Sequence, residues 1–246
     1  MAIDLVPQTG LPEQDLRRSE RRVYSQNGED GIIQEVLRRI GLSTRCFVEF
    51  GVEDGGECNC ARLALEEGFS GLFMEAAAEP FARLRERFAD CPAVQCVQAH
   101  VRPDNIQRLL AEAAVPREFD VLSIDVDGQD FYIWRAIVDW SPRLVVIEYN
   151  AQKPPPERWV MIENAAHRWD GTDYYGAALA SLTALGRSKG YELVCCDSNG
   201  VNAFFVRRDL IDAQFLDPVV QYHYRPLRHG VDGAGHPHRI GPGVAL

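Results

Sequence analysis

Short apolar runs alternate with helical patterns over residues 46–149, and this alternation restricts the fold more than any other feature. The runs are CFVEF, GLFME, VQCVQA, FDVLSID and RLVVIEYN. The segments between them, such as EPFARLRERFAD and QDFYIWRAIVDW, are each long enough for an amphipathic helix of roughly two to four turns. Continuously apolar strands joined by helices form parallel sheets that are buried on both faces and have right-handed crossovers. We therefore expect an α/β protein with a doubly wound, mostly parallel sheet.

The segments on either side of this alternation extend the predicted fold. Residues 191–208, YELVCCDSNGVNAFFVRR, contain two strand-like runs around an S-N-G turn, a pattern that predicts a β-hairpin. The hairpin brings the sheet to seven strands, with antiparallel pairing at its C-terminal end. Residues 174–190 have a helical pattern, as do residues 27–41, where Gly41 is the expected C-cap.

Three segments fall outside this pattern. Residues 1–22 form an N-terminal extension, and residues 151–173 interrupt the main domain, residues 23–208, with three prolines and two tryptophans. An insertion of this length is too long for an ordinary connection, and such loops are often functional lids. Residues 209–246 have weak periodicity, and we expect an irregular tail that packs on the domain or in an oligomer contact. Its four histidines are expected to be solvated: His223, His229, His236 and His238.

The glycine-rich turn after the first run, VEFGVEDGGECN, matches neither a dinucleotide fingerprint nor a P-loop. A ligand of an open α/β sheet binds beyond the carboxyl ends of the strands, where Gly51 would let it approach the backbone. A phosphate would require hydrogen-bond donors and no surplus anions. The turn instead carries four carboxylates, Glu49, Glu53, Asp54 and Glu57. This charge favours a cationic ligand such as S-adenosylmethionine, which has a sulfonium and an ammonium group.

Glu75 ends the second apolar run, about twenty residues beyond the glycine turn. A carboxylate at this position of related folds accepts hydrogen bonds from the ribose hydroxyls of a bound nucleotide. This spacing leaves NAD as an alternative cofactor. It also leaves a solvated strand end as the alternative role for Glu75.

Four motifs in a fixed order resemble the FkbM-type methyltransferase superfamily: YSQNGEDGII, VEFGVEDGGECN, LSIDVDGQD and VVIEYN. The resemblance covers roughly residues 23–150. It implies a class I methyltransferase fold and binding of S-adenosylmethionine, and family members are associated with O-methylation of sugars, glycans and natural products. The Asp-x-Asp of residues 125–127 differs from the commoner Asp-x-Glu. The residues expected to bind the cofactor are Gln26, Asn27, Glu49, Gly51, Asp54, Gly55, Asn59, Glu75, His100 and Asp125. For Asn27, an N-cap of the following helix is the alternative.

Polar side chains also follow the fourth and fifth runs. Asp125 ends the fourth run and Asp127 follows it, and Glu148 and Asn150 lie at the end of the fifth. Because parallel strands end at the same edge of a sheet, these side chains form an oxygen-rich candidate site for Mg²⁺ or Mn²⁺. Such a metal would hold an acceptor hydroxyl and lower its pKa.

Two other interpretations of the same motifs remain open. In one, Asp125, Asp127 or His167 is a general base without a metal. In the other, Asp125 holds the amino group of the cofactor, while Asp127 and Asp130 cap the next helix. Aromatic side chains of the insertion either face a sugar or planar acceptor or fill the core: Trp159, His167 and Trp169.

The composition argues against several classes of function. The formal net charge of −10 disfavours binding to nucleic acids or to anionic membranes. No run approaches the roughly 18 apolar residues of a membrane span, and the N-terminus lacks the apolar region of a signal peptide. Seven cysteines without framework spacing predict reduced thiols. We expect a cytoplasmic methyltransferase that acts on a small hydroxylated acceptor. The sequence leaves open whether it forms a homo-oligomer. The alternatives are other chemistry at the cofactor site, such as cyclisation or elimination, and a non-catalytic interaction module.

Overall fold

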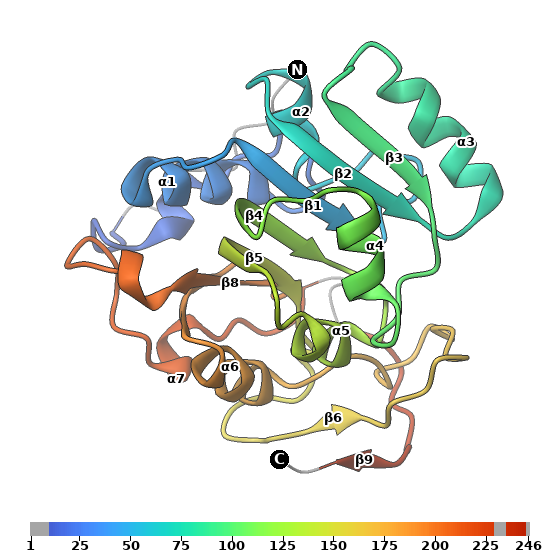
Figure 1. The fold of residues 1–246 in the computed structure, drawn as a ribbon. Helices are drawn as coiled ribbons and strands as arrows, with labels where there is room; N and C mark the ends of the chain where they lie inside the picture. Colours follow the sequence, from blue (N-terminus) through green and yellow to red (C-terminus); the bar gives the residue numbers. More distant parts are fainter. Residues whose placement is uncertain (1–9, 229–234, 245–246) are drawn as a thin grey trace.

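The computed structural model describes residues 10–228 and 235–244, and a seven-stranded sheet runs through its centre (Figure 1). The strands are β1 (Cys46–Phe50), β2 (Ser70–Glu75), β3 (Val94–Gln98), β4 (Glu118–Ile124), β5 (Ser141–Glu148), β7 (Tyr191–Cys196) and β8 (Asn202–Arg207). Their order is β3-β2-β1-β4-β5-β8-β7. Strands β1 to β5 pair in parallel, and β8 pairs antiparallel with β5 and β7. The predicted mostly parallel sheet with its C-terminal hairpin is confirmed.

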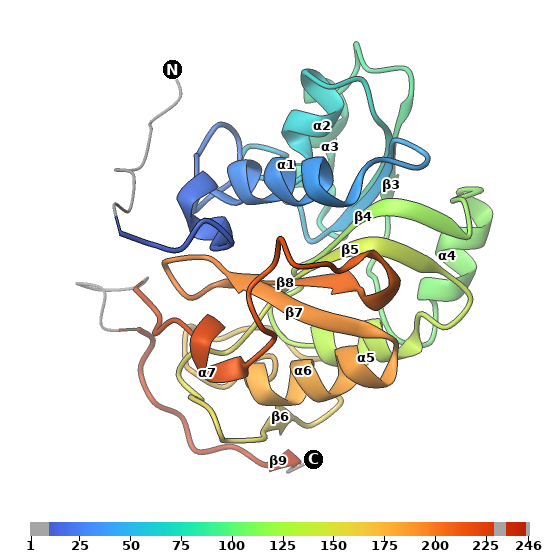
Figure 2. The ribbon, with the colours of Figure 1, turned by 90° about the vertical axis from the view of Figure 1, so that its left-hand side faces the viewer.

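Helices cover both faces of this sheet (Figure 2). On one face lie α1 (Glu29–Ile40), α2 (Ala61–Leu65) and α3 (Ala78–Arg87), and on the other lie α4 (Ile106–Glu112), α5 (Asp130–Ala136) and α6 (Leu179–Ser188). Adjacent strand residues belong to opposite cores: Phe47 lies in the core that contains α1 to α3, and Val48 lies in the core that contains α4 to α6. Both faces are therefore buried, which is why the strands are continuously apolar. Within the described ranges, no helix is long and apolar enough to cross a membrane.

Helix α1 begins and ends at glycines. Its N-cap is Gly28, with a φ of 105°, and its C-cap is Gly41, as predicted. The alternative in which Asn27 caps this helix is wrong, because the Asn27 side chain donates instead to Gln26 and Glu29. Glycine takes the N-cap position here because the backbone has a positive φ.

The turn between β7 and β8 is held by a buried carboxylate. Asp197 accepts hydrogen bonds from the backbone N–H groups of Asn199, Val201 and Asn202. Burial, with the nearby charge of Glu29, raises the pKa of Asp197 to about 8. This turn packs beside the N-terminal motif, since Asn199 Nδ2 donates to the side chain of Asn27 at 3.0 Å.

The C-terminal tail is more ordered than the sequence predicts. It contains the short elements η2 (Arg208–Leu210), α7 (Val220–His223) and β9 (Gly243–Val244), and β9 pairs with β6 (Val160–Met161) of the insertion. His223 is buried, with Nε2 2.9 Å from the carbonyl of Asp217, and burial lowers its pKa to about 4. The prediction of a solvated residue is therefore wrong for His223. His229 lies outside the described residues. In the N-terminal extension, the described part includes η1 (Leu16–Ser19), while residues 1–9 are not described.

Candidate active site

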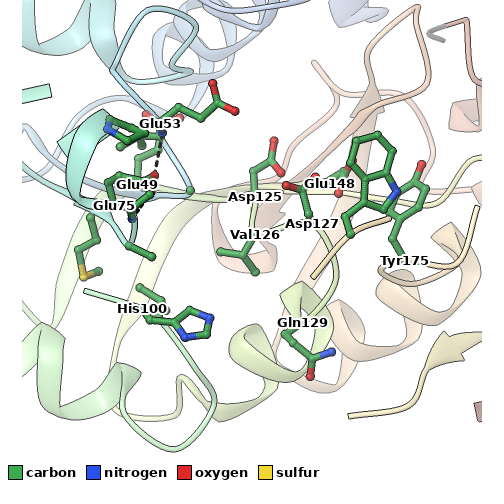
Figure 3. A pocket seen from close by; sticks show the side chains of 18 of the residues that line it. Glu49, Glu53, Glu75, His100, Asp125, Val126, Asp127, Gln129, Glu148 and Tyr175 are labelled. Atoms are coloured by element: carbon green, nitrogen blue, oxygen red, sulfur yellow. Dashed lines mark hydrogen bonds between the residues drawn. The ribbon is translucent and has the colours of Figure 1, made fainter. Parts of the chain in front are cut away.

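A cavity of about 840 Å³ opens at the carboxyl ends of the parallel strands (Figure 3). Its walls come from the glycine-rich turn, the ends of β2, β4 and β5, the insertion and the tail. Figure 3 shows Glu53 and Glu75 on one side of the cavity, Asp125, Asp127 and Glu148 in the centre, and Tyr175 beyond them. Ligand sites in proteins commonly have volumes of roughly 300–1,000 Å³, so the cavity is large enough for a cofactor and part of an acceptor.

Glu75 is held rigidly at the end of β2. Its Oε2 accepts from the N–H of Glu53 at 2.9 Å, and its Oε1 accepts from the N–H of Ala77 at 2.7 Å. The side chain is 8% exposed and lines the cavity. Because a carboxylate oxygen can accept more than one hydrogen bond, Glu75 can still accept the hydroxyls of a ribose.

Glu49 lines the cavity but binds its own chain. Its two carboxylate oxygens accept from the N–H groups of Asn59 and Cys60, both at 2.8 Å, and Oε1 also accepts from Ser123 Oγ. Burial raises the pKa of Glu49 to about 7, although these hydrogen bonds lower it. Glu49 therefore positions the chain that leads into α2.

Two glycines of the turn are required by packing. Gly51 has a φ of 79°, and a Cβ there would lie 1.4 Å from the backbone oxygen of Asp125. A Cβ on Gly55 would lie 2.8 Å from the ring of Phe88. The missing side chains make room for the protein itself, and the expectation that a ligand approaches the backbone at Gly51 stays a prediction. Gly55 is not among the residues that line the cavity, whereas Gly51 and Asp54 are.

Three carboxylates converge between β4 and β5. Asp125, Asp127 and Glu148 each offer an oxygen atom, and these atoms lie within 4.8 Å of one another. Burial and the neighbouring acidic charges raise the pKa of Asp125 and of Glu148 well above the usual range. The Oε2 atom of Glu148 is buried and has no hydrogen-bond partner among the residues that the structure describes. Like charges this close favour a bound proton or cation between them.

The loop after β4 presents Asp127 to the cavity. Asp130 accepts from the N–H groups of Val126 and Gly128, at 2.8 and 2.9 Å, and so folds the loop back on itself. Asp127 takes a positive φ of 53°. The N-cap of α5 is Gln129, without a side-chain cap. The interpretation of Asp127 and Asp130 as helix caps is therefore wrong.

Asn150 does not join the carboxylate cluster. Its Nδ2 donates to the carbonyls of Asp173 and Tyr175, at 2.8 and 2.9 Å, and its Oδ1 accepts from the N–H of Gln152. Strand β5 ends at Glu148, so the alternation that would align residues 148 and 150 is lost. Asn150 holds the insertion instead, and the expected metal-ligand set loses this member.

The aromatic side chains of the insertion divide between the cavity and the core. His167 and Trp169 line the cavity. His167 lies against Gly128, where a Cβ would be 2.6 Å from its ring, and burial lowers the pKa of His167. Trp159 is not a cavity residue: it packs on Tyr174, with ring centroids 5.8 Å apart. The expectation of an acceptor-facing surface is therefore unsupported for Trp159.

The tail closes the cavity opposite the sheet. Gln152 exchanges two hydrogen bonds with the backbone of His236, at 2.8 and 2.9 Å. The buried carboxylate of Asp173 accepts from His238 Nδ1 and from the N–H of Arg239, both at 2.7 Å. His236 consequently lies against Trp169, with ring centroids 4.8 Å apart, and lines the cavity. The expectation of a solvated side chain is wrong for His236.

The remaining predicted residues are distributed as follows. Gln26, His100 and Asn59 line the cavity, whereas Asn27 does not. The lining residues that sequence reasoning missed include Gln129, Tyr175, Asn202 and His236. A signal for the tail was present in the sequence as its glycines, and three of those that the structure describes have close contacts: Gly235, Gly241 and Gly243. A Cβ on Gly241 would lie 2.2 Å from the ring of Tyr174, and one on Gly243 would lie 1.9 Å from that of Trp159.

No protein-family model matches this chain, and no curated protein matches it. Solved structures similar to it are class I S-adenosylmethionine-dependent methyltransferases. One is the N-terminal domain of EvdMO1 with SAH bound, at 14% identity over 74% of this chain and 80% of that one, with a TM-score of 0.48. The CurJ carbon methyltransferase has 10% identity over 80% and 59%, with a TM-score of 0.47. A methyltransferase from Aquifex aeolicus has 10% identity over 70% and 87%, with a TM-score of 0.42. At these identities the similarity concerns the fold alone. The strand order by itself is that of an open, mostly parallel, doubly wound α/β sheet that ends in an antiparallel hairpin.

Proposed function

We propose that this protein is an S-adenosylmethionine-dependent methyltransferase of the FkbM-like type that methylates a hydroxyl of a small acceptor. The observation that carries the proposal is that one cavity joins two chemically different halves. One half, at β1 and β2, contains Glu75 and the acidic turn, and the other, at β4 and β5, contains the carboxylate cluster. Donor and acceptor sites of a transfer reaction must meet in this way.

The first half fits the cofactor. Glu75 is fixed by two backbone N–H groups and can still accept ribose hydroxyls. Glu53 and Asp125 line the same cavity and favour the positive charges of the ligand. When bound, S-adenosylmethionine supplies an electrophilic methyl group. The residues of the turn hold and orient it, and the surrounding walls limit the access of water.

The second half fits an acceptor hydroxyl. Asp127 is the most exposed member of the cluster, so its carboxylate can take the proton that the hydroxyl loses. Trp169, Tyr175 and His236 form the wall beyond it. Aromatic side chains suit the apolar face of a sugar or of a planar natural-product ring. The insertion then covers the acceptor and shields the reaction from water.

A divalent cation is compatible with the same cluster. Asp125, Asp127 and Glu148 would hold it, because they are hard oxygen ligands and one Glu148 oxygen is buried with no hydrogen-bond partner in the described part of the chain. A bound Mg²⁺ or Mn²⁺ would supply Lewis acidity to the acceptor oxygen. Asp127 acting alone as a base is the metal-free form of the proposal.

Calorimetric titration with S-adenosylmethionine and S-adenosylhomocysteine tests the cofactor, and release of S-adenosylhomocysteine with a panel of sugars and phenols tests the reaction. We expect both ligands to bind and at least one acceptor to be methylated. Asp127→Ala should keep ligand binding and lose transfer. Absence of binding to either ligand would refute the proposal. Binding followed by a different product would favour other chemistry at this site, and binding without turnover of any kind would favour an interaction module.

A further inference from the structure

The side-chain amides of the cavity differ in what they bind. Among the described residues, four amides line it: Gln26, Asn59, Gln129 and Asn202. The amide nitrogens of the last three donate to Ser123 Oγ at 3.1 Å, to Met161 Sδ at 3.6 Å and to Glu29 Oε1 at 2.8 Å. The Nε2 of Gln26 has no such partner in the described part of the chain. Both hydrogens of this amide are therefore available to a ligand, whereas each of the other three amides already uses one.

The orientation of this amide is set by its neighbour. Asn27 Nδ2 donates one hydrogen bond to Glu29 Oε1 at 3.2 Å. It donates a second one to Gln26 Oε1 at 3.0 Å. Because the oxygen is turned toward Asn27, the NH₂ group of Gln26 is turned away from it.

The segment that carries Gln26 is held at both ends. Arg22 forms an ion pair with Glu57 of the glycine-rich turn. At the other end, Glu29 accepts from Asn202, the residue that pairs with Glu148 in the register of β8 and β5. Gln26 consequently lines the cavity from a segment tied both to the glycine-rich turn and to the strand beside the carboxylate cluster, where the two proposed halves of the site meet.

The acidic side chains of the cavity favour an added donor such as Gln26 Nε2. The carboxylates that line it, including Glu49, Glu53 and Asp125, favour the sulfonium and the ammonium of the cofactor but repel its carboxylate. A carboxylate binds more favourably here where N–H donors compensate for that repulsion. Two arginines also line the cavity, but Arg102 pairs with Asp104 and Arg168 donates to the carbonyl of His167.

We propose that Gln26 binds the carboxylate of the cofactor's amino-acid part, so that affinity depends on that part as well as on the adenosine. This inference rests on the proposed function, because it presupposes the cofactor. Gln26 is thus a binding residue that discriminates the intact cofactor from its shortened breakdown products.

Calorimetric titration with two probes tests the inference. S-adenosylhomocysteine contains the amino-acid part, whereas 5′-deoxy-5′-methylthioadenosine lacks it. Gln26→Leu should lower the affinity for the first probe by roughly ten- to a hundredfold, which is the contribution of a hydrogen bond to a charged group. The affinity for the second probe should not change. Gln26→Glu should weaken the first probe further, because it places a like charge beside the carboxylate. Gln14→Leu makes the same change at an exposed site away from the cavity and should alter neither affinity.

The outcomes separate this inference from the proposed function. A wild-type protein that binds neither probe would refute the proposed function and the inference with it. A wild-type protein that binds both, combined with a folded Gln26→Leu variant that binds S-adenosylhomocysteine normally, would overturn the inference alone. An equal loss of affinity for both probes in Gln26→Leu would likewise overturn the inference. Gln26 would then support the structure of the whole site and not bind the carboxylate.

Discussion

The backbone oxygen of Asp125 lies 1.4 Å from the position that a Cβ on Gly51 would occupy. The two chain segments also pair, since the N–H of Asp125 donates to the carbonyl of Phe50 at 3.3 Å. The glycine-rich turn and the carboxylate cluster are therefore joined by direct backbone contact. A shift of either one displaces the other, so the donor and acceptor halves of the cavity have a fixed relative position.

This contact predicts a large cost for Gly51→Ala. The new methyl group would collide with backbone atoms that cannot rotate away, and the positive φ adds roughly 1–2 kcal/mol of strain. Gly68→Ala is the matched control, because Gly68 has a φ of 66° and nothing within 4 Å of its Cβ position. Urea denaturation should give a loss of stability for Gly51→Ala that exceeds the control by about 2 kcal/mol or more. Equal losses would mean that the strands separate easily.

Glu75→Ala should lower the affinity for S-adenosylhomocysteine by roughly one to two orders of magnitude. A buried hydrogen bond to a charged group contributes roughly 1.5–3 kcal/mol, and the ribose hydroxyls would lose their acceptor. Unlike Gln26→Leu, this variant should weaken 5′-deoxy-5′-methylthioadenosine as well, because that probe keeps the ribose. Glu79→Ala removes an exposed carboxylate from the next helix and should leave both affinities unchanged. Unchanged affinity in a folded Glu75→Ala protein would exclude this residue from the site.

The metal form of the mechanism predicts a requirement for divalent ions. EDTA should suppress methyl transfer, and Mg²⁺ or Mn²⁺ should restore it, because an ion relieves the repulsion among Asp125, Asp127 and Glu148. Asp127→Asn should reduce the response to added metal. Asp139→Asn, an exposed site outside the cavity, should respond as the wild type does. Full turnover in metal-stripped protein would contradict the metal form and support Asp127 as a plain base.

The contact between the tail and the insertion predicts a selective loss of acceptor turnover. Deleting residues 151–173 would remove β6 and the buried Val160 and Met161, so we expect that deletion to destabilise the domain. Asp173→Ala is a sharper test, because it removes the buried acceptor of His238 and Arg239. It should increase hydrogen exchange in residues 235–244 and lower transfer, while S-adenosylhomocysteine still binds.

The control for that variant is Asp170→Ala, whose exposed carboxylate pairs with Arg239 at the surface. Exposed ion pairs contribute little, roughly 0–1 kcal/mol, so exchange and transfer should remain near the wild-type values. If Asp173→Ala loses cofactor affinity as strongly as it loses transfer, the contact of Asp173 with His238 and Arg239 supports the whole domain and not the acceptor site alone.

The buried carboxyl of Glu49 predicts how stability changes with pH. Its pKa rises from 4.5 to about 7 on folding, so the folded state holds a proton that the unfolded state has lost within this window. The free energy of unfolding should therefore fall as pH increases from 4.5 to 7, by at most about 3 kcal/mol from this group. In chemical denaturation across this pH range, the free energy of unfolding should fall less steeply for Glu49→Gln than for the wild type. A parallel slope in the variant would show that another group causes the dependence.

The sequence by itself determined the layers of the fold. Each strand of the sheet is a local apolar run buried on both faces, and each helix is a local amphipathic pattern, so residues near in sequence specify the element. The glycine-rich turn, Glu75 and the aspartates after β4 could be located for the same reason. In open α/β sheets the ligand-binding edge follows from strand direction alone.

Only the tertiary structure decided which of these side chains face a ligand. Glu49 accepts from Ser123, and Gly51 lies against the backbone of Asp125. Both contacts are made to strand β4 or the residue after it, more than 70 residues away in the chain, and such contacts are not encoded in spacing. Asn150 turns to the insertion because β5 ends two residues earlier. His236 reaches the cavity through hydrogen bonds to Gln152, 84 residues away in the chain. Long-range packing chooses between equivalent polar residues, because each buried donor and acceptor must find a partner that only the folded chain brings near.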